Sequence, residues 1–499
     1  MRLTLRRHFL LIHGLCLVVL FGGITASQAD ETLLRVGIAE KEITPPAEYP
    51  MAGYYHERLA QGQLDPLKAK AIVMRQGAEA VAVVFCDLTG IAFDLTHAIR
   101  TEVSKHSELE PNQIILCATH SHTAPDYYRD LYLHLSTTRR NEATQYPGYL
   151  IQQITSAILT AEQSAETIEI LVAAPQQQIP VAFNRRFVMR DGSVKTWQKL
   201  NNPDVVRAAG PIDPDLSFCL FRSQGTGKPL GVLSHFALHL DTVGGSYWSA
   251  DYPFYIEQAV RKTLSDSTVS LFGLGCCGDI NHVDPSQSDR NKTDYIGGQL
   301  GKTLSNAFEA ATSVNKPRLV HRSSLVRLPL RPITAEQAER GRELMLAAKE
   351  GVDVEFFDLV RAYKSVILAQ FQLDEYDLQK NPAASWGLSH QLAGCGMQLP
   401  VEVHTVGLGP DVALVFLPGE VFVDLGLAIK QASPFKQTLV IELSNAVETA
   451  YIPTQAAFAG GSYEVTNSTI QSGSGERLVE EALRQLGQLA KQLHEPAME

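Results

Sequence analysis

Short apolar runs of strand-forming residues recur along the whole chain and alternate with segments whose apolar positions have helical spacing. Helices are expected at 93–106, 146–165 and 252–264. Strands are expected at 33–39, 69–74, 80–86, 113–118, 168–174, 216–221, 231–238, 269–275, 401–409, 412–417 and 438–444. This alternation predicts one large α/β domain.

The segment 334–392 differs, because long helical periodicity replaces the strand signals there. No Pro-, Gly- or Ser-rich linker isolates it, so we expect a helical insertion that lies on the same core.

Two histidines follow the strand expected at 113–118, in the sequence THSHTAPD. His120 and His122 would leave a strand on the same side, since side chains alternate with a period of two. Pro125 cannot continue a strand ladder, so we expect the pair where the strand gives way to a loop. The alternative is that the two histidines only share a solvated strand end and neither bind a metal nor act as an acid/base pair.

Partners for this pair occur elsewhere in the chain. His235 and His239 share a face by strand or helix spacing, and Glu420 stands just before a helical pattern, where the helix dipole would favour its ionised form. Two histidines and a carboxylate, with a position left for water, are the ligands of a catalytic zinc. Each residue also has a structural alternative: a core histidine, or an ordinary acid at a helix start.

Several motifs in order resemble the neutral/alkaline non-lysosomal ceramidases, zinc amidohydrolases that split the N-acyl bond of ceramide. These motifs are VGIAEKEITPP, GYYHERLAQGQLDPLKAKA, VVFCDL, THSHTAP, FNRR, FALH, GCCGDIN, LPGE and AYIPT followed by GGSYE. The resemblance implies a mixed-sheet α/β catalytic domain with one Zn²⁺ per chain. It implies the zinc ligands His120, His239, Glu420 and Tyr451, and it places His122 and Arg185 on the substrate side of the metal.

Two departures from the family pattern change this expectation. Asn281 and His282 stand where these ceramidases have a catalytic serine and a proline, and asparagine cannot be a nucleophile although it can hydrogen-bond a substrate amide. We therefore expect attack by zinc-activated water on a ceramide-like lipid or a related N-acyl compound. The chain also ends soon after a helical stretch at 475–495, so we expect no C-terminal immunoglobulin-like domain.

The N-terminal residues 1–29 have the arginine-rich start, apolar core and small-x-small end of a secretory signal peptide. We expect a mature catalytic domain over 30–499 that is exported to the periplasm or the extracellular space. No later segment is apolar enough for a membrane span. The formal net charge of −11 argues against a nucleic-acid partner.

Two aspartates are further candidates near the site. Asp87 and Asp251 are placed to orient a ligand histidine, although a helix cap or turn is an equal alternative. Arg185 and Arg186 would, without the resemblance, be expected as a solvated surface pair.

Two other functions also remain open: a zinc hydrolase of another ester or amide class on this fold, and a non-catalytic exported binding protein.

Overall fold

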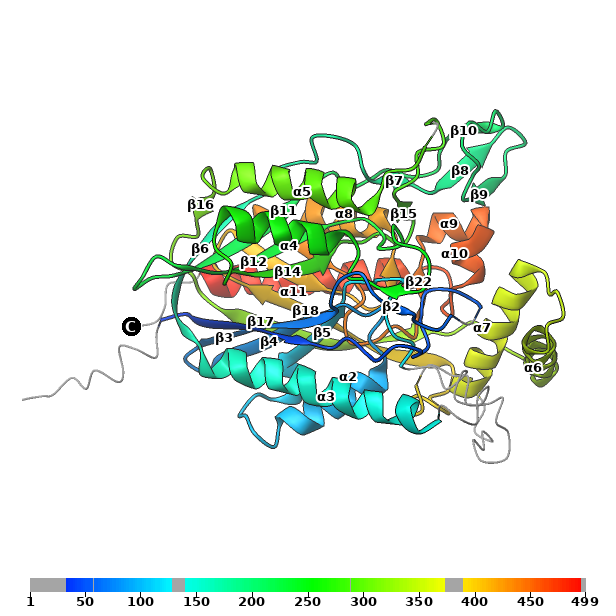
Figure 1. Ribbon diagram of the computed structural model, residues 1–499, viewed down its shortest axis with the longest axis horizontal. Coiled ribbons are helices and arrows are strands. Elements are labelled where there is room, and N and C mark those ends of the chain that lie inside the picture. The colour runs from blue at the N-terminus through cyan, green and yellow to red at the C-terminus, as the bar shows by residue number, and fades with distance from the viewer. Residues whose placement is uncertain (1–32, 57, 128–139, 288, 373–388, 495–499) are drawn as a thin grey trace, which may run out of the picture.

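The computed structural model describes residues 33–56, 58–127, 140–287, 289–372 and 389–494 (Figure 1). A nine-stranded mixed sheet forms its centre. This sheet runs in the order β14 (Val269–Leu274), β12 (Pro229–Phe236), β11 (Ser217–Ser223), β6 (Glu166–Ala173), β1 (Arg35–Glu42), β3 (Lys68–Gln76), β4 (Glu79–Cys86) and β5 (Ile114–Ala118), with β16 (Thr312–Ser313) beside β6. The expected α/β fold with a mixed sheet is confirmed, since β12–β14 and β4–β5 pair in parallel and the other neighbours are antiparallel.

A second sheet of four strands lies against the first. Its order is β17 (Val320–Pro329), β18 (Gln398–Gly407), β19 (Val412–Phe416) and β21 (Gln437–Ile441). Strand β3 shows how the period of two builds the layers: Ala71 and Val73 face the helices, and Ile72 and Met74 face the second sheet. Both faces are buried at the centre of β3, so its residues 71–74 are all apolar and do not alternate with polar residues.

The helices cover the outer faces of the two sheets. On the large sheet lie α2 (Phe93–Val103), α3 (Arg140–Gln163), α4 (Tyr252–Thr263) and α5 (Thr293–Ala307), and the four-stranded sheet is covered by α8 (Val423–Ala432) and α11 (Ser474–His494). Three hydrophobic clusters therefore fill the spaces of a helix–sheet–sheet–helix sandwich. No helix in the described ranges has the length and apolar character needed to cross a membrane.

Short elements gather at one end of the sandwich, on the right in Figure 1. They are three two-stranded pairs, one three-stranded ladder and two short helices: β2 (Gly62–Gln63) with β13 (Tyr247–Trp248), β7 (Phe183–Asn184) with β15 (Ile280–Asn281), β20 (Glu420–Val421) with β22 (Tyr451–Ile452), β8 (Arg186–Met189) with β9 (Val194–Thr196) and β10 (Val205–Ala208), α9 (Gln455–Gly460) and α10 (Ser462–Thr466). This end carries the candidate site. The 3₁₀ turn Pro111–Gln113 lies elsewhere, just before β5.

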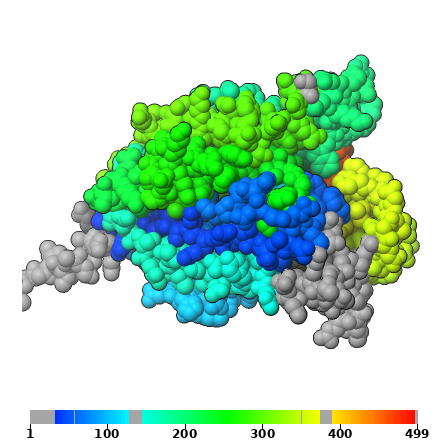
Figure 2. Space-filling view, in the orientation of Figure 1, coloured from blue at the N-terminus to red at the C-terminus, as the bar shows by residue number. Residues whose placement is uncertain are grey.

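Helices α6 (Ala335–Lys349) and α7 (Phe356–Gln372) occupy the segment expected to be helical. They pack on each other, and α7 joins the cluster under the four-stranded sheet through Val360, Ile367 and Phe371. In Figure 2 their yellow surface forms one end of the molecule. The proposed insertion continues into 373–388, which lies outside the described residues, as does the expected signal peptide.

Candidate metal centre and cavity

The two histidines of THSHTAPD lie beyond the strand, in the loop that follows β5. His120 has a positive φ of 75°, a conformation that side chains other than glycine seldom adopt. The expected loop position is confirmed, but strand alternation is not what brings the rings together. The turned backbone does so, and it places His122 Nε2 3.2 Å from His120 Nε2.

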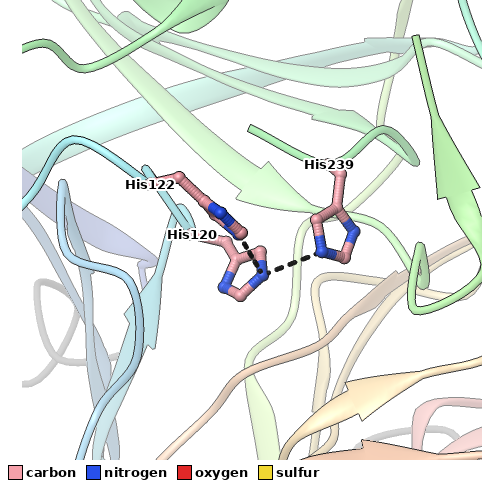
Figure 3. A group of neighbouring side chains, drawn as sticks. All are labelled: His120, His122 and His239. Atoms are coloured by element: carbon pink, nitrogen blue, oxygen red, sulfur yellow. Dashed lines mark hydrogen bonds between the residues drawn. The ribbon is translucent and has the colours of Figure 1, made fainter. Parts of the chain in front are cut away.

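His239 completes a three-histidine group with His120 and His122 (Figure 3). It follows β12 in a loop, and its Nε2 lies 3.1 Å from that of His120. His235, the alternative to His239, is a core residue whose Nε2 bonds the Val440 carbonyl at 2.9 Å. His235 and His239 therefore do not share a face, because the strand ends between them.

Backbone carbonyls, not aspartates, orient the two buried histidines. His120 Nδ1 donates to Thr89 O at 2.5 Å, and His239 Nδ1 donates to Cys277 O at 3.0 Å. A carbonyl oxygen can only accept, so each Nδ1 carries the proton and each Nε2 presents a lone pair. Two such lone pairs that face each other are suited to a shared cation.

The expectation that Asp87 and Asp251 would orient the histidines is wrong. Asp87 accepts from the backbone of Lys68 and from the Thr119 hydroxyl, and Asp251 caps α4 while binding the loop at Thr242. Both carboxylates serve the local backbone, which is the usual use of an aspartate at a turn or helix start.

Glu420 brings a carboxylate to the same point. Its Oε2 lies 3.3 Å from both His120 Nε2 and His239 Nε2, and this buried oxygen has no hydrogen-bond partner in the described chain. The helix-dipole expectation is wrong, since Glu420 lies in β20 and Asp279 binds the first amide of α8 instead.

Tyr451 is placed beside Glu420 by the parallel pairing of β20 with β22. The tight turn before β20 uses Gly419, whose φ of 59° and closeness to Ala450 O, 2.6 Å from where a Cβ would be, exclude larger residues. Burial raises the pKa of Tyr451 well above its usual value, while the Arg185 guanidinium acts in the opposite direction.

The donor atoms fit a divalent metal ion. Tetrahedral ligands about 2.0–2.1 Å from zinc lie about 3.3 Å from one another. The separations of His120, His239 and Glu420 are 3.1–3.3 Å, and all three atoms present lone pairs. His122 Nε2 and the Tyr451 hydroxyl flank this group, so the geometry offers two candidates for a fourth position.

Arg185 and Arg186 are buried, which excludes the alternative of a solvated surface pair. The Glu464 carboxylate accepts hydrogen bonds from Arg185 Nε at 2.9 Å and from Arg186 Nη1 at 2.8 Å. Arg185 Nη2 donates to the Tyr451 hydroxyl at 3.0 Å, whereas its Nη1 has no hydrogen bond in the described chain. Sequence reasoning missed Glu464, although it stands in the quoted motif GGSYE.

A cavity of about 550 Å³ opens beside the metal-binding group. The cavity is lined by the three residues expected to act on the substrate, His122, Arg185 and Asn281, and also by Tyr451. Aromatic side chains form much of the remaining wall: Tyr54, Tyr55, Phe187, Trp197, Phe356 and Tyr463. Sequence reasoning did not single out this wall, because an aromatic residue looks the same in a core and in a pocket.

His122 and Asn281 have polar atoms available in this cavity. Burial, followed by His120 and His239, lowers the pKa of His122 well below its usual value, which keeps the ring neutral. Asn281 Oδ1 accepts from the Val283 amide at 3.0 Å, which leaves its Nδ2 as a donor. Among the described residues, no serine, threonine or cysteine lines the cavity.

Comparisons with known proteins agree with these features. Residues 34–246, which contain His120, His122, Arg185 and His239, match a family model described as neutral/alkaline non-lysosomal ceramidase, N-terminal. The crystal structure of neutral ceramidase from Pseudomonas aeruginosa matches with a TM-score of 0.67 and 18% identity, over 93% of this chain and 76% of that chain. A ceramidase structure complexed with C2 matches with a TM-score of 0.67 and 18% identity, over 94% and 77%.

A comparison with curated proteins finds no match. At 18% identity the two structures establish the fold, and the sequence match establishes the relationship over residues 34–246. The chain thus has the fold of neutral ceramidase, and the resemblance to the neutral/alkaline non-lysosomal ceramidases is confirmed.

Proposed function

We propose that this protein is a zinc-dependent amidohydrolase that cleaves the N-acyl bond of a ceramide-like lipid or a related N-acyl compound. The observation that carries the proposal is the convergence of lone pairs from His120, His239 and Glu420 at the edge of a cavity. The resemblance to neutral ceramidases supports the amide as the bond that is cleaved.

We assign the metal to His120, His239, Glu420 and Tyr451, with one zinc per chain. When bound, zinc lowers the pKa of a coordinated water to about 7 and polarises a carbonyl oxygen. His122 competes with Tyr451 for the fourth position. We favour Tyr451 because it is fixed beside Glu420 by β-pairing and held by Arg185, whereas His122 is less buried.

The remaining polar residues act on the substrate. Arg185 can donate from Nη1 to the oxyanion that develops on the carbonyl, and the neutral ring of His122 can take a proton and return it to the leaving amine. Asn281 can donate from Nδ2 to the substrate.

The described lining of the 550 Å³ cavity has no hydroxyl or thiol other than those of tyrosines, and Thr89, beside His120 and Glu420, donates its hydroxyl to Ser121 O at 2.7 Å. This lining favours direct attack by water over an acyl-enzyme.

Zinc content and turnover in matched variants test this assignment. His239→Ala should lose stoichiometric zinc, and His122→Ala should retain zinc while losing about 10²-fold or more in kcat. His106→Ala, at an exposed position in the turn that follows α2, is the control and should change neither. One zinc per chain in His239→Ala would show the ligand set to be wrong, and loss of zinc in His122→Ala would move His122 into it.

The substrate class is tested in the same preparations. Hydrolysis should be measured across N-acyl lipids, amino-acid amides and simple esters. We expect N-acyl amides to lead, and a clear preference for esters would favour the alternative hydrolase class.

Export is part of the proposal. The expected signal peptide would be removed after Ala29. N-terminal sequencing of the protein recovered outside the cytoplasm should begin at Asp30, and a start at Met1 would contradict cleavage.

A further inference from the structure

The motif GYYHER ends in a buried arginine, Arg58, which is not among the described residues that line the cavity. Its Nη2 donates to the carbonyls of Ala52 and His122, at 2.5 Å each, and its Nη1 donates to Gly245 O at 2.6 Å. The guanidinium carbon lies 4.0 Å from the centre of the Tyr54 ring. One side chain therefore bonds three separate segments of the chain.

These three segments are also joined to one another by their backbones. The Ala52 amide donates to Ala124 O at 2.9 Å, and the His122 amide donates to Leu240 O at 3.0 Å. Gly53 approaches His122 so closely that a Cβ at position 53 would lie 2.7 Å from His122 O, and its φ of 97° suits glycine. The segments therefore pack as one unit around His122.

An arginine suits this position for a physical reason. A buried guanidinium is tolerated only where its N–H groups find acceptors, and the three carbonyl oxygens supply them. The planar fork of arginine donates in several fixed directions at once, which the compact ammonium of lysine does not. Because His122 O is one of the three acceptors, the fork fixes the backbone from which the His122 ring projects towards His120 (Figure 3).

We propose that Arg58 is a positioning residue that holds the ring of His122 at the metal-binding group. The inference rests on the proposed amidohydrolase function, in which His122 transfers a proton. The proposed zinc ligands are held by other contacts, namely the Thr89 and Cys277 carbonyls and the pairing of β20 with β22. Loss of Arg58 should therefore displace His122 and leave zinc bound.

Hydrogen–deuterium exchange read by mass spectrometry tests the positioning without substrate. In Arg58→Met, peptides that cover 50–56, 119–126 and 239–249 should exchange at least about tenfold faster than in the wild type, because opening these segments no longer breaks hydrogen bonds to a charged group. Peptides of α11 should exchange as in the wild type. Unchanged exchange in the three segments would overturn the proposal.

Arg100→Met is the matched control for this measurement. Arg100 is another largely buried arginine that donates to a backbone carbonyl, Ile114 O at 2.8 Å, but it does so at the start of β5, whereas His122 follows the end of that strand. Arg100→Met should therefore leave exchange in the three segments, zinc content and kcat at their wild-type values.

A double-mutant cycle on the zinc-loaded protein tests whether the effect passes through His122. Arg58→Met should retain one zinc per chain and lose about 10²-fold in kcat, as His122→Ala does. The double variant Arg58→Met/His122→Ala should be no slower than His122→Ala alone. Losses that multiply would overturn the proposal, because Arg58 would then act elsewhere, and loss of zinc in Arg58→Met would overturn it as well.

Arg58→Lys keeps the charge without the fork and provides the test if Arg58→Met does not fold. We expect exchange between that of the wild type and that of a protein without the fork, and a loss of about tenfold in kcat. Wild-type exchange and kcat in Arg58→Lys would show that the fork is not needed and would overturn the proposal.

The outcome is separable from that of the proposed function. Faster exchange confined to the three segments, in a protein that hydrolyses no amide, would leave the hold of Arg58 on His122 standing and remove the amidohydrolase assignment. Amide hydrolysis at the wild-type rate by Arg58→Met would do the reverse.

Discussion

At the scale of single residues, the site is defined by ring nitrogens and a carboxylate oxygen that face one another in the described part of the chain. His120 and His239 have their Nδ1 protons fixed by backbone carbonyls, so their Nε2 atoms and Glu420 Oε2 meet as acceptors only. Buried acceptors that face one another are costly unless a cation neutralises them.

Asn281 is the residue at which this chain departs most from the ceramidases it resembles. The residue lines the cavity with its Nδ2 available, and it offers no hydroxyl. We therefore predict that ceramide is a poorer substrate than other N-acyl amides, and that Asn281→Ser raises kcat/KM for a short-chain ceramide by about tenfold or more. Wild-type protein that prefers ceramide across the panel, with no gain in the variant, would contradict this prediction.

At the scale of elements, the ladder of β20 with β22 connects two metal-ligand candidates. Glu420 pairs directly with Tyr451, and the approach of the two segments requires a residue without a side chain at 419. The ladder is only two residues long in each strand, so its geometry depends on the turn that precedes it.

Gly419→Ala tests this dependence. A Cβ at 419 meets Thr449 and Ala450 at a φ of 59°, so we expect a loss of about 2 kcal/mol or more in the free energy of unfolding, together with weaker zinc binding. Gly487→Ala in α11 is the matched control, because a Cβ there has open space and alanine favours helix by about 1 kcal/mol. Unchanged zinc affinity in Gly419→Ala would show that the turn does not position the ligands.

At the scale of the whole molecule, ion pairs between layers make stability depend on pH. Glu257 of α4 bonds Lys68 at 2.7 Å and Lys70 at 2.5 Å, and both lysines lie on β3 of the large sheet. Burial alone would raise the pKa of Glu257, but Lys70 and Lys68 outweigh it and hold the pKa at about 2. The folded state therefore binds the Glu257 proton more weakly than the unfolded chain does.

This depressed pKa gives a signed prediction. The contribution of Glu257 is fully present above the unfolded pKa of about 4.5, and it is lost as the pH falls towards 2. Its size is about 3 kcal/mol, from a shift of about 2.5 pKa units. Urea unfolding at pH 6 and pH 3 should therefore show a smaller loss in Lys70→Met/Glu257→Leu than in the wild type. An equal loss in both proteins would exclude this pair as the source.

The sequence by itself indicated most strands of the two large sheets, the main helices except α5, the α/β class and the position of the histidine pair after β5, whereas β17 was not expected. These features follow from periodic burial and from residues such as Pro125 that end a strand, and both are properties of neighbouring positions. The motifs in order also indicated the ceramidase relationship. The local pattern offered His120, His122, His235, His239 and Glu420 as candidates. Only the resemblance selected His120, His239 and Glu420 among them and added Tyr451.

Only the tertiary structure decided which distant groups are partners. It replaced Asp87 and Asp251 by the carbonyls of Thr89 and Cys277, buried Arg185 and Arg186 on Glu464, and paired Asp241 with His282. Such choices depend on how loops from separate strands pack at one end of the sandwich. Hydrophobic periodicity and composition indicate whether a residue is buried. They do not indicate which hydrogen-bond partner a buried polar atom will have.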